Sequence, residues 1–411
     1  MGKESTIETT TSIDFEAFKQ SVLADFKLAN ISRETSLLGR REVLTGKAKF
    51  GIFGDGKELP QIAWAKAFQK GDFRSGYYRD QTFMMAIGEL NIEQFFAGLY
   101  AHTDIANDPM SAGRQMGGHF TTHSLDKNFN WKNLTEQYNS SSDISPTGAQ
   151  MPRLLGLAQA SKVYRELKSK NSNKFSKNGN EVAWGTIGNA STSEGVFFET
   201  INAAGVLQVP MVISIWDDEY GISVHAKHQT TKENISEILK GFQRDSKSNG
   251  YEMLKVHGWD YVELINSYQK ASEIARNEHV PVMIHVNELT QPQGHSTSGS
   301  HERYKSANRL KWERSNDCNI KFRQWIISND ISSDEEITIL ERSIKKSVKE
   351  GKQKAWKDFC DPIKAEKQEV VQLMKSASDS SSQSVFVNKI IDQLESINEP
   401  LQKDILSTIY D

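Results

Sequence analysis

Cysteine is scarce in this chain of 411 residues, which contains only Cys318 and Cys360. The two lie far apart and have no His or Cys companions at the spacing of metal ligands. The sequence therefore predicts neither a zinc site nor a disulfide framework, and we expect both residues to be reduced thiols.

Long apolar runs and a strong excess of one charge are also missing. No apolar run is long enough to cross a bilayer, and the N-terminal segment MGKESTIETTTSID is polar and lacks a signal-peptide core. The formal net charge of −3 indicates no preference for nucleic acid or for a membrane surface. We therefore expect a cytoplasmic protein that binds neither.

Strand-like apolar runs alternate with helical patterns along most of the chain. Strands are predicted over residues 182–187, 209–216, 251–256 and 280–288. Helices are predicted over residues 15–28, 32–45, 149–169, 230–242 and 261–279. This alternation is typical of an α/β fold with a doubly wound, mostly parallel sheet.

Both ends of the chain differ from this alternating region. A polar lead over residues 1–13 precedes the first helices, and the chain from residue 307 onward is charged and helical. Helices are predicted there over residues 311–328, 334–361 and 384–394. We therefore expect an N-terminal tail with helices (1–45), an α/β domain (46–306) and a helical C-terminal extension (307–411).

The chain is organised around residues 181–223, EVAWGTIGNASTSEGVFFETINAAGVLQVPMVISIWDDEYGIS. The first strand stops at a turn of small and polar residues, and a helix pattern starts directly behind it, near Ser193. The second strand ends in Asp217, Asp218, Glu219, Tyr220 and Gly221. Two strand ends thus bring oxygen-rich loops to one edge of a sheet, where open α/β sheets bind ligands.

These loops suit a diphosphate that is held through a magnesium ion. A helix N-terminus offers unpaired N–H groups to phosphate, and Mg²⁺ takes oxygen ligands in octahedral geometry. Asn189 and Asp218 can each supply a side-chain oxygen, and Tyr220 can supply its backbone carbonyl. The alternative is an ordinary βαβ unit whose turn residues cap a helix.

The stretch resembles the thiamine diphosphate motif of alpha subunits of 2-oxoacid dehydrogenases, of the branched-chain and pyruvate types. Four other stretches agree with that family in the same order, and the likeness covers most of residues 30–330. They are YYRD (77–80), GRQMGGH (113–119), SPTGAQMP (145–152) and TQPQGHSTSGSHERYKS (290–306).

The resemblance implies a thiamine diphosphate-binding fold with a defined set of site residues. Arg79 would hold the diphosphate on the side opposite the metal, and His295 would be the active-site histidine. The implied metal ligands are Asn189, Asp218 and Tyr220. The implied cofactor-binding residues are Tyr78, Arg79, Ser145, Thr147, Gly188, Asn189, Ala190, Ser191, Asp218, Tyr220 and His295.

The resemblance also implies an activity and partners. The activity would be oxidative decarboxylation of a branched-chain 2-oxoacid, 2-oxoisovalerate, with thiamine diphosphate and Mg²⁺ and with acyl transfer to lipoyl groups. A beta subunit, or the beta half of a fused chain, would supply the pyrimidine-binding domain and its catalytic Glu in a heterotetramer-like assembly. A lipoyl-bearing acyltransferase core would be the second partner. Pyruvate specificity and a non-catalytic subunit with a degenerate cofactor motif are the alternatives.

The sequence departs from the family pattern at several positions. The acid and the amide of the motif are exchanged, giving Asn189 and Asp218, so the pair keeps one negative charge. Gln291 stands where relatives have a phosphate-contacting arginine, and Ala190 replaces a glycine. Ala149 replaces a threonine of a related potassium site.

A literal Gly-Asp-Gly occurs in GIFGDG, residues 51–56. No acid–amide pair or second strand end follows it at the required distance, so we interpret it as a decoy of the thiamine motif. The resemblance places this loop near the substrate entrance instead.

Overall fold

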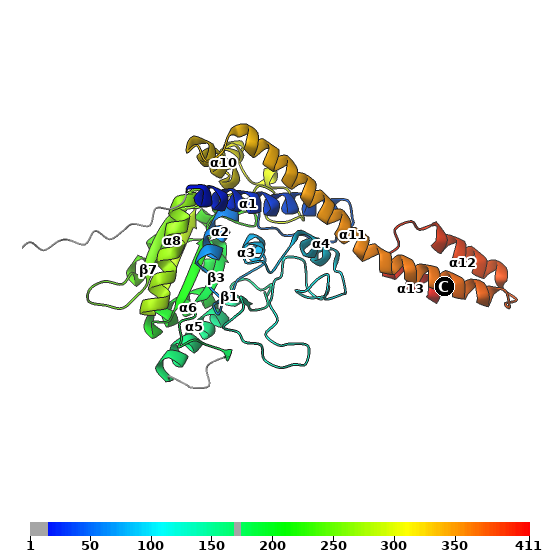
Figure 1. Ribbon diagram of the computed structural model, residues 1–411, viewed down its shortest axis with the longest axis horizontal. Helices are drawn as coiled ribbons and strands as arrows, with labels where there is room; N and C mark the ends of the chain where they lie inside the picture. Colours follow the sequence, from blue (N-terminus) through cyan, green and yellow to red (C-terminus); the bar gives the residue numbers. More distant parts are fainter. Residues whose placement is uncertain (1–14, 168–173) are drawn as a thin grey trace, which may run out of the picture.

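A computed structural model describes residues 15–167 and 174–411 (Figure 1). The predicted N-terminal lead lies outside the described residues, as does the predicted end of the helix at 168–169. Cys318 and Cys360 are both free and buried. In the described part of the chain, no helix is both long and apolar enough to pass through a membrane.

The centre of the molecule is a parallel sheet of six strands in the order β2-β1-β3-β4-β8-β7. The strands are β1 (Phe73–Ser75), β2 (Asn139–Ser140), β3 (Ala183–Gly188), β4 (Met211–Trp216), β7 (Glu252–His257) and β8 (Val282–Asn287). A separate antiparallel ribbon pairs β5 (Tyr220–Gly221) with β6 (Val224–His225). The parallel sheet, with helices on both faces, confirms the predicted fold class.

Alternation along the strands divides the apolar core between the two faces of the sheet. On β4, Val212 and Trp216 belong to one cluster, which includes residues of α2 (Glu58–Ala67) and α8 (Tyr261–Glu273). Met211, Ile213 and Ile215 belong to the other, with residues of α5 (Gln150–Leu167) and α6 (Gly195–Leu207). Successive side chains of a strand point to opposite faces, so β4 is buried on both.

Most of the remaining helices surround the α2/α8 side or extend beyond it, whereas α7 (Ile235–Ile238) packs in the core on the α5/α6 side. The others are α1 (Phe15–Leu44), α3 (Gln81–Ala86), α4 (Ile92–Tyr100), α9 (Ala307–Ser315), α10 (Cys318–Ser328), α11 (Asp334–Ser378), α12 (Ser384–Ser396) and α13 (Gln402–Tyr410). Helix α11 packs on α1 and α4 and then continues to α12 and α13, which project from the rest of the molecule (Figure 1). The domain boundaries at 45/46 and 306/307 stay a prediction.

The N-terminal segment is one helix, α1, where the sequence predicts two. The gap expected at residues 29–31 is helical, and polar residues that follow it are buried and hydrogen-bonded. Ser32 Oγ lies 2.7 Å from Thr82 Oγ1, and Gln81 Nε2 donates to Ser36 Oγ at 2.8 Å. Polar residues here pack against α3 rather than facing solvent, so the helix continues through them.

The helix predicted over residues 230–242 is wrong. The segment is a 3₁₀ turn (Thr231–Glu233), the single-turn α7 and a second 3₁₀ turn (Leu239–Phe242). Lys232 and Glu233 have φ of 61° and 56°, left-handed values that end a right-handed helix. Asn234 then caps α7 by accepting a bond from Glu237 N.

The C-terminal helices also differ from the prediction. Residues 311–328 fall into α9 and α10, because Asp317 interrupts the helix and caps α10 by accepting a bond from Asn319 N. Helix α11 does not stop at residue 361 but continues through Pro362 to Ser378. Helix α13 follows the predicted last helix, α12.

Candidate active site

The first two loops of the site lie side by side because β3 and β4 pair in parallel register. Gly188 at the end of β3 is opposite Trp216 at the end of β4, and Asn189 N donates to Trp216 O at 3.1 Å. Both strand ends open into a cavity of about 370 Å³. The predicted meeting of these two loops at one sheet edge is therefore confirmed.

Nearly all of the predicted site residues line this cavity. Those that do are Tyr78, Arg79, Thr147, Gly188, Asn189, Ala190, Ser191, Asp218, Tyr220 and His295. Ser145 does not line it. Its Oγ lies 2.9 Å from Nε2 of His119, whose ring is 6.0 Å from that of Tyr78.

Arg79 and His295 contact each other at one side of the cavity. The Arg79 guanidinium donates to Phe53 O at 2.5 Å and to His295 O at 3.0 Å, and its Nη2 lies 3.1 Å from His295 Nδ1. Arginine can only donate, so Nδ1 of His295 accepts and the ring proton is on Nε2. Burial and the Arg79 charge lower the pKa of His295 to about 4, so the ring is neutral at physiological pH.

Asp218 lines the cavity, whereas the carboxylate of its neighbour Asp217 is hydrogen-bonded to His285 and to the backbone of Glu219. His285 Nε2 lies 2.9 Å from Asp217 Oδ2, and Ser236 Oγ lies 2.6 Å from His285 Nδ1. Asp217 Oδ1 also accepts a bond from Glu219 N at 2.8 Å. These contacts fix the loop after β4 and leave the Asp218 carboxylate directed to the site.

A buried lysine pairs with Asp218. Lys57 Nζ lies 2.9 Å from Asp218 Oδ2. Burial opposes the charge of Asp218, yet Lys57 and Lys305 hold the pKa of this carboxyl below its usual value. Burial lowers the pKa of Lys57, and Asp218 opposes that shift.

The turn after β3 accommodates its alanine. Gly221 of β5 lies so close that a Cβ built on it would meet the Ala190 Cβ at 2.5 Å. Because residue 221 is a glycine, there is room for the methyl group of Ala190, a position at which the resemblance implies a glycine. Behind Ala190 the chain forms a 3₁₀ turn (Ala190–Ser193) before α6 begins at Gly195.

The residues at the two strand ends fit a diphosphate and a magnesium ion. Asn189 Nδ2 is buried and has no hydrogen-bond partner in the described structure, so it is available to an acceptor such as a phosphate oxygen. One carboxylate, one amide oxygen and one backbone carbonyl match the few protein ligands that Mg²⁺ takes when phosphates complete its coordination. No cluster of three or more His, Cys, Asp or Glu side chains suited to a metal occurs within residues 15–167 and 174–411.

The family model described as "Dehydrogenase E1 component" matches residues 42–363, which is most of the chain. The chain belongs to this family.

Individual relatives share about a quarter of their residues with this chain over the aligned segments. The 2-oxoisovalerate dehydrogenase subunit alpha of Bacillus subtilis is 27% identical over 293 residues, 71% of this chain and 77% of the relative. The mitochondrial 2-oxoisovalerate dehydrogenase subunit alpha 1 of Arabidopsis thaliana is 26% identical over 314 residues, 76% of this chain and 58% of the relative. The pyruvate dehydrogenase E1 component subunit alpha of Rickettsia typhi is 25% identical over 203 residues, 49% of this chain and 55% of the relative.

Several side chains that line the cavity were not predicted as site residues from the sequence. Lys57, Glu194, Trp216, Tyr304 and Lys305 also line it. Lys57 follows the Gly-Asp-Gly loop directly, and a lysine beside a glycine-rich turn is a recognisable phosphate signal. The decoy interpretation placed that loop near the substrate entrance and assigned no cofactor-binding residue to it, although Lys57 lines the cavity.

Proposed function

We propose that this E1 component binds thiamine diphosphate with Mg²⁺ and decarboxylates a 2-oxoacid, passing the acyl group to a lipoyl group. The observation that carries this proposal is the convergence of the motif residues on one cavity. Segments far apart in sequence contribute to it, including Arg79, Asn189, Asp218 and His295. When bound, the cofactor supplies the electron sink for decarboxylation, and the protein supplies position and charge.

The side chains divide the task by their chemistry. Asn189, Asp218 and the Tyr220 carbonyl would hold the metal, since they offer oxygen ligands at two adjacent strand ends. Arg79 would bind the diphosphate from the other side, because a guanidinium can pair with two phosphate oxygens. Thr147 lines the same cavity and would contact the rings of the cofactor, and the hydrogen-bonded Ser145 would position the loop before α5.

His295 is the catalytic residue in this proposal. Its Nδ1 accepts from Arg79, so Nε2 carries the proton and can donate a hydrogen bond to substrate oxygen. Its lowered pKa keeps this ring neutral, which preserves the donor at Nε2 and an acceptor role at Nδ1. Arg79 thus fixes the tautomer as well as the cofactor.

The substrate we propose is a branched-chain 2-oxoacid, 2-oxoisovalerate. Two relatives named for 2-oxoisovalerate dehydrogenase support it. We further propose a cytoplasmic, heterotetramer-like assembly in which a beta partner supplies the pyrimidine-binding domain and its catalytic Glu. A lipoyl-bearing acyltransferase core would then accept the acyl group.

The test is a calorimetric titration of the chain, with its beta partner present, with thiamine diphosphate and Mg²⁺. We expect saturable binding that depends on Mg²⁺. In a turnover assay of the same assembly, we expect kcat/KM to be higher for 2-oxoisovalerate than for pyruvate. Higher kcat/KM for pyruvate would assign the pyruvate alternative. Absence of binding would make this a non-catalytic subunit.

Two variants test the residue roles. Arg79→Met should raise the cofactor Kd, since a hydrogen bond to a charged group contributes roughly 1.5–3 kcal/mol. His295→Ala should lower kcat more than cofactor affinity. If both variants bind and turn over like the parent, the 290–306 loop is not part of the site.

A further inference from the structure

Lys57 is a buried lysine that the family resemblance does not assign to the cofactor site. It is 2% exposed, yet it lines the cavity. Its ammonium donates to Asp218 Oδ2 at 2.9 Å, to Thr290 O at 3.0 Å and to Gln291 Oε1 at 2.6 Å. A buried charge requires such partners, so these three acceptors fix the ammonium beside Asp218.

The loop before Lys57 is pressed against the segment that carries Gln291. Gly56 has φ of 85°, and a Cβ built on it would meet Thr290 O at 2.2 Å, so only glycine fits this approach. Asp55 accepts bonds from Gln291 Nε2 at 3.2 Å and from Gln293 N at 3.0 Å. The contacts on both sides of Gly56 therefore hold the Lys57 side chain next to Gln291.

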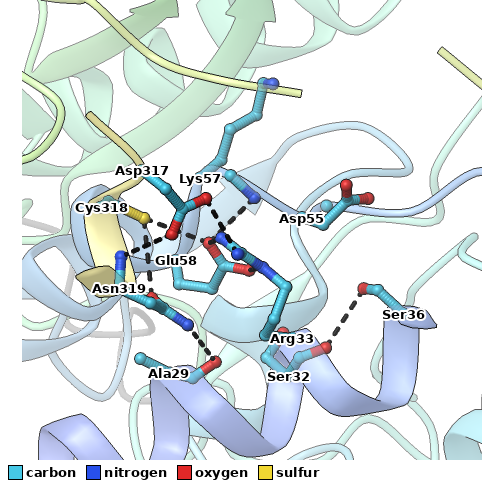
Figure 2. Close-up of polar contacts among 12 residues, drawn as sticks. Ala29, Ser32, Arg33, Ser36, Asp55, Lys57, Glu58, Asp317, Cys318 and Asn319 are labelled. Carbon is cyan, nitrogen blue, oxygen red and sulfur yellow. Dashed lines mark hydrogen bonds and ion pairs between the residues drawn. The ribbon is translucent and has the colours of Figure 1, made fainter. Parts of the chain in front are cut away.

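A second set of contacts anchors this loop from below, as Figure 2 shows. Glu58 accepts a bond from Gly56 N at 2.9 Å and two bonds from Arg33 at 2.6 and 2.8 Å. Arg33 also pairs with Asp317 at 2.9 Å. The Lys57 side chain extends away from this cluster (Figure 2), so adjacent residues serve separate purposes: Glu58 anchors, and Lys57 faces the cavity.

Lys57 contacts two residues at which this chain departs from the family pattern, Asp218 and Gln291. The resemblance implies an arginine where this chain has Gln291, and the Lys57 ammonium lies 2.6 Å from the Gln291 amide oxygen. A positive charge is thus restored at the same place from another segment. Asp218, an acid where the pattern has an amide, is the counter-charge of this ammonium.

We propose that Lys57 is a further cofactor-binding residue that neutralises Asp218 until a divalent cation takes this carboxylate, and that then turns to the diphosphate. This inference rests on the proposed function. An ammonium has three N–H donors, and all three are used in the described structure. A phosphate contact therefore requires exchange of one acceptor, and Asp218 is the acceptor for which a metal ion competes.

Lys57→Met tests the proposal, because it removes the charge and keeps an apolar stem. Lys66→Met is the matched control: Lys66 is on α2, the helix that begins directly after Lys57, pairs with Asp25 at 2.9 Å and does not line the cavity. The chain with its beta partner is titrated with thiamine diphosphate and Mg²⁺ in a calorimeter. We expect the cofactor Kd to rise about 10- to 100-fold in Lys57→Met and to stay unchanged in Lys66→Met.

Binding of Mn²⁺ alone, followed by electron paramagnetic resonance, should move in the opposite direction. Without Lys57, Asp218 loses its direct ion pair, so Mn²⁺ should bind more tightly to Lys57→Met than to the parent. A loss of packing would weaken both ligands and would not produce opposite shifts. Lys57→Gln, which keeps N–H donors near Asp218, replaces Lys57→Met if that variant does not fold.

A rescue variant completes the test. Lys57→Met/Gln291→Arg returns the positive charge to the position it has in relatives and should recover most of the lost cofactor affinity. Parent-like cofactor binding by Lys57→Met, a parallel loss of Mn²⁺ binding, or no recovery in the double variant would each overturn the role of Lys57. These results would leave parent binding, and so the proposed function, intact, whereas a parent that binds no cofactor would overturn both.

Discussion

At the scale of single residues, the distribution of charge at the two strand ends decides how the proposed site would hold a metal. Asp218 is the acid of the pair and Asn189 the amide, and both line the cavity. Asp218 is also paired with Lys57. The negative charge of the pair is therefore on the β4 side, next to a cation, instead of on the β3 side.

The first prediction compares the two positions directly. Asp218→Asn leaves two neutral amides and an unpaired Lys57, so the magnesium concentration needed for half-maximal cofactor binding should rise strongly. Asn189→Asp adds a carboxylate ligand and should be tolerated or should lower that concentration. Fluorescence titration with Mg²⁺ at fixed thiamine diphosphate measures both. An unchanged magnesium requirement in Asp218→Asn would remove this residue from the metal shell.

The second prediction concerns pH and a histidine far from the cavity. Burial lowers the pKa of His279 to about 4, and its Nε2 bonds to Gly179 O at 2.9 Å. In the unfolded chain the pKa is about 6.5, so the unfolded chain binds more protons between these two values. Stability that is present above pH 6.5 is therefore lost as the pH falls toward 4.

His279→Asn should reduce this loss. Asparagine does not titrate and tolerates the left-handed φ of 56° at this position. We expect a smaller fall in the free energy of unfolding between pH 7.5 and pH 5 than in the parent, measured by urea unfolding. The fall should not vanish, because His295 also has a lowered pKa. Identical slopes for variant and parent would show that His279 is not protonated on unfolding.

At the scale of elements, the sequence predicts β3, β4, β7 and β8 better than the helix ends, whereas the short strands β1 and β2 were not predicted. The runs that form β3 and β4 are bounded by turn residues, so local chemistry alone defines them. The continuation of α11 through Pro362 coincides with a distant contact. Pro362 cannot donate to Asp358 O, but His102 Nε2 lies 3.3 Å from this oxygen, and Nδ1 of the same ring accepts from Asp104 N. No pattern near Pro362 indicates a partner some 260 residues away.

The third prediction tests how closely α11 packs on α4. A Cβ built on Gly351 would meet Ile92 Cγ2 at 2.6 Å, whereas one on the exposed Gly156 of α5 would meet nothing within 4 Å. Glycine inside a helix is less stable than alanine by roughly 0.5–1 kcal/mol. Gly156→Ala should therefore stabilise the protein by about this amount, whereas Gly351→Ala should destabilise it by roughly 1–3 kcal/mol through overpacking.

Denaturant unfolding of both variants, at one pH, gives the comparison. The helix propensity gain is common to the two substitutions, so their difference isolates the contact with Ile92. Equal stabilisation by both would mean that α11 and α4 do not pack at this distance.

At the scale of the whole molecule, the site joins segments that only the tertiary fold brings together. The order of the family stretches is sufficient to predict Arg79, Asn189, Asp218 and His295 at one cavity. The lysine after the Gly-Asp-Gly loop is a local signal, but the contacts of Lys57 with Thr290 and Gln291, more than 230 residues away, could not be predicted from it. A sequence pattern identifies what a loop contains, but it does not show which other loop lies against it.

The last prediction is that this chain does not catalyse alone. Thiamine chemistry requires the aminopyrimidine ring to be held and its nitrogen protonated by a carboxylic acid, which the resemblance assigns to a glutamate on a second α/β domain. The described residues form one six-stranded parallel sheet, and beyond Ser306 they are helical, with α12 and α13 projecting away from the sheet. No second sheet of comparable size is found in this part of the chain, so we expect the acid to come from a beta subunit or from the beta half of a fused chain.

Purified chain of residues 1–411 is therefore expected to show no sustained decarboxylation with 2-oxoisovalerate, thiamine diphosphate, Mg²⁺ and an artificial electron acceptor. Addition of the beta partner should restore turnover, and a partner whose pyrimidine-contacting glutamate is changed to glutamine should bind without restoring it. This matched pair separates assembly from proton transfer, because both partners complete the interface and only one can protonate the ring. Sustained decarboxylation by the isolated chain would mean that it contains its own acid and that the partner is not needed for the chemistry.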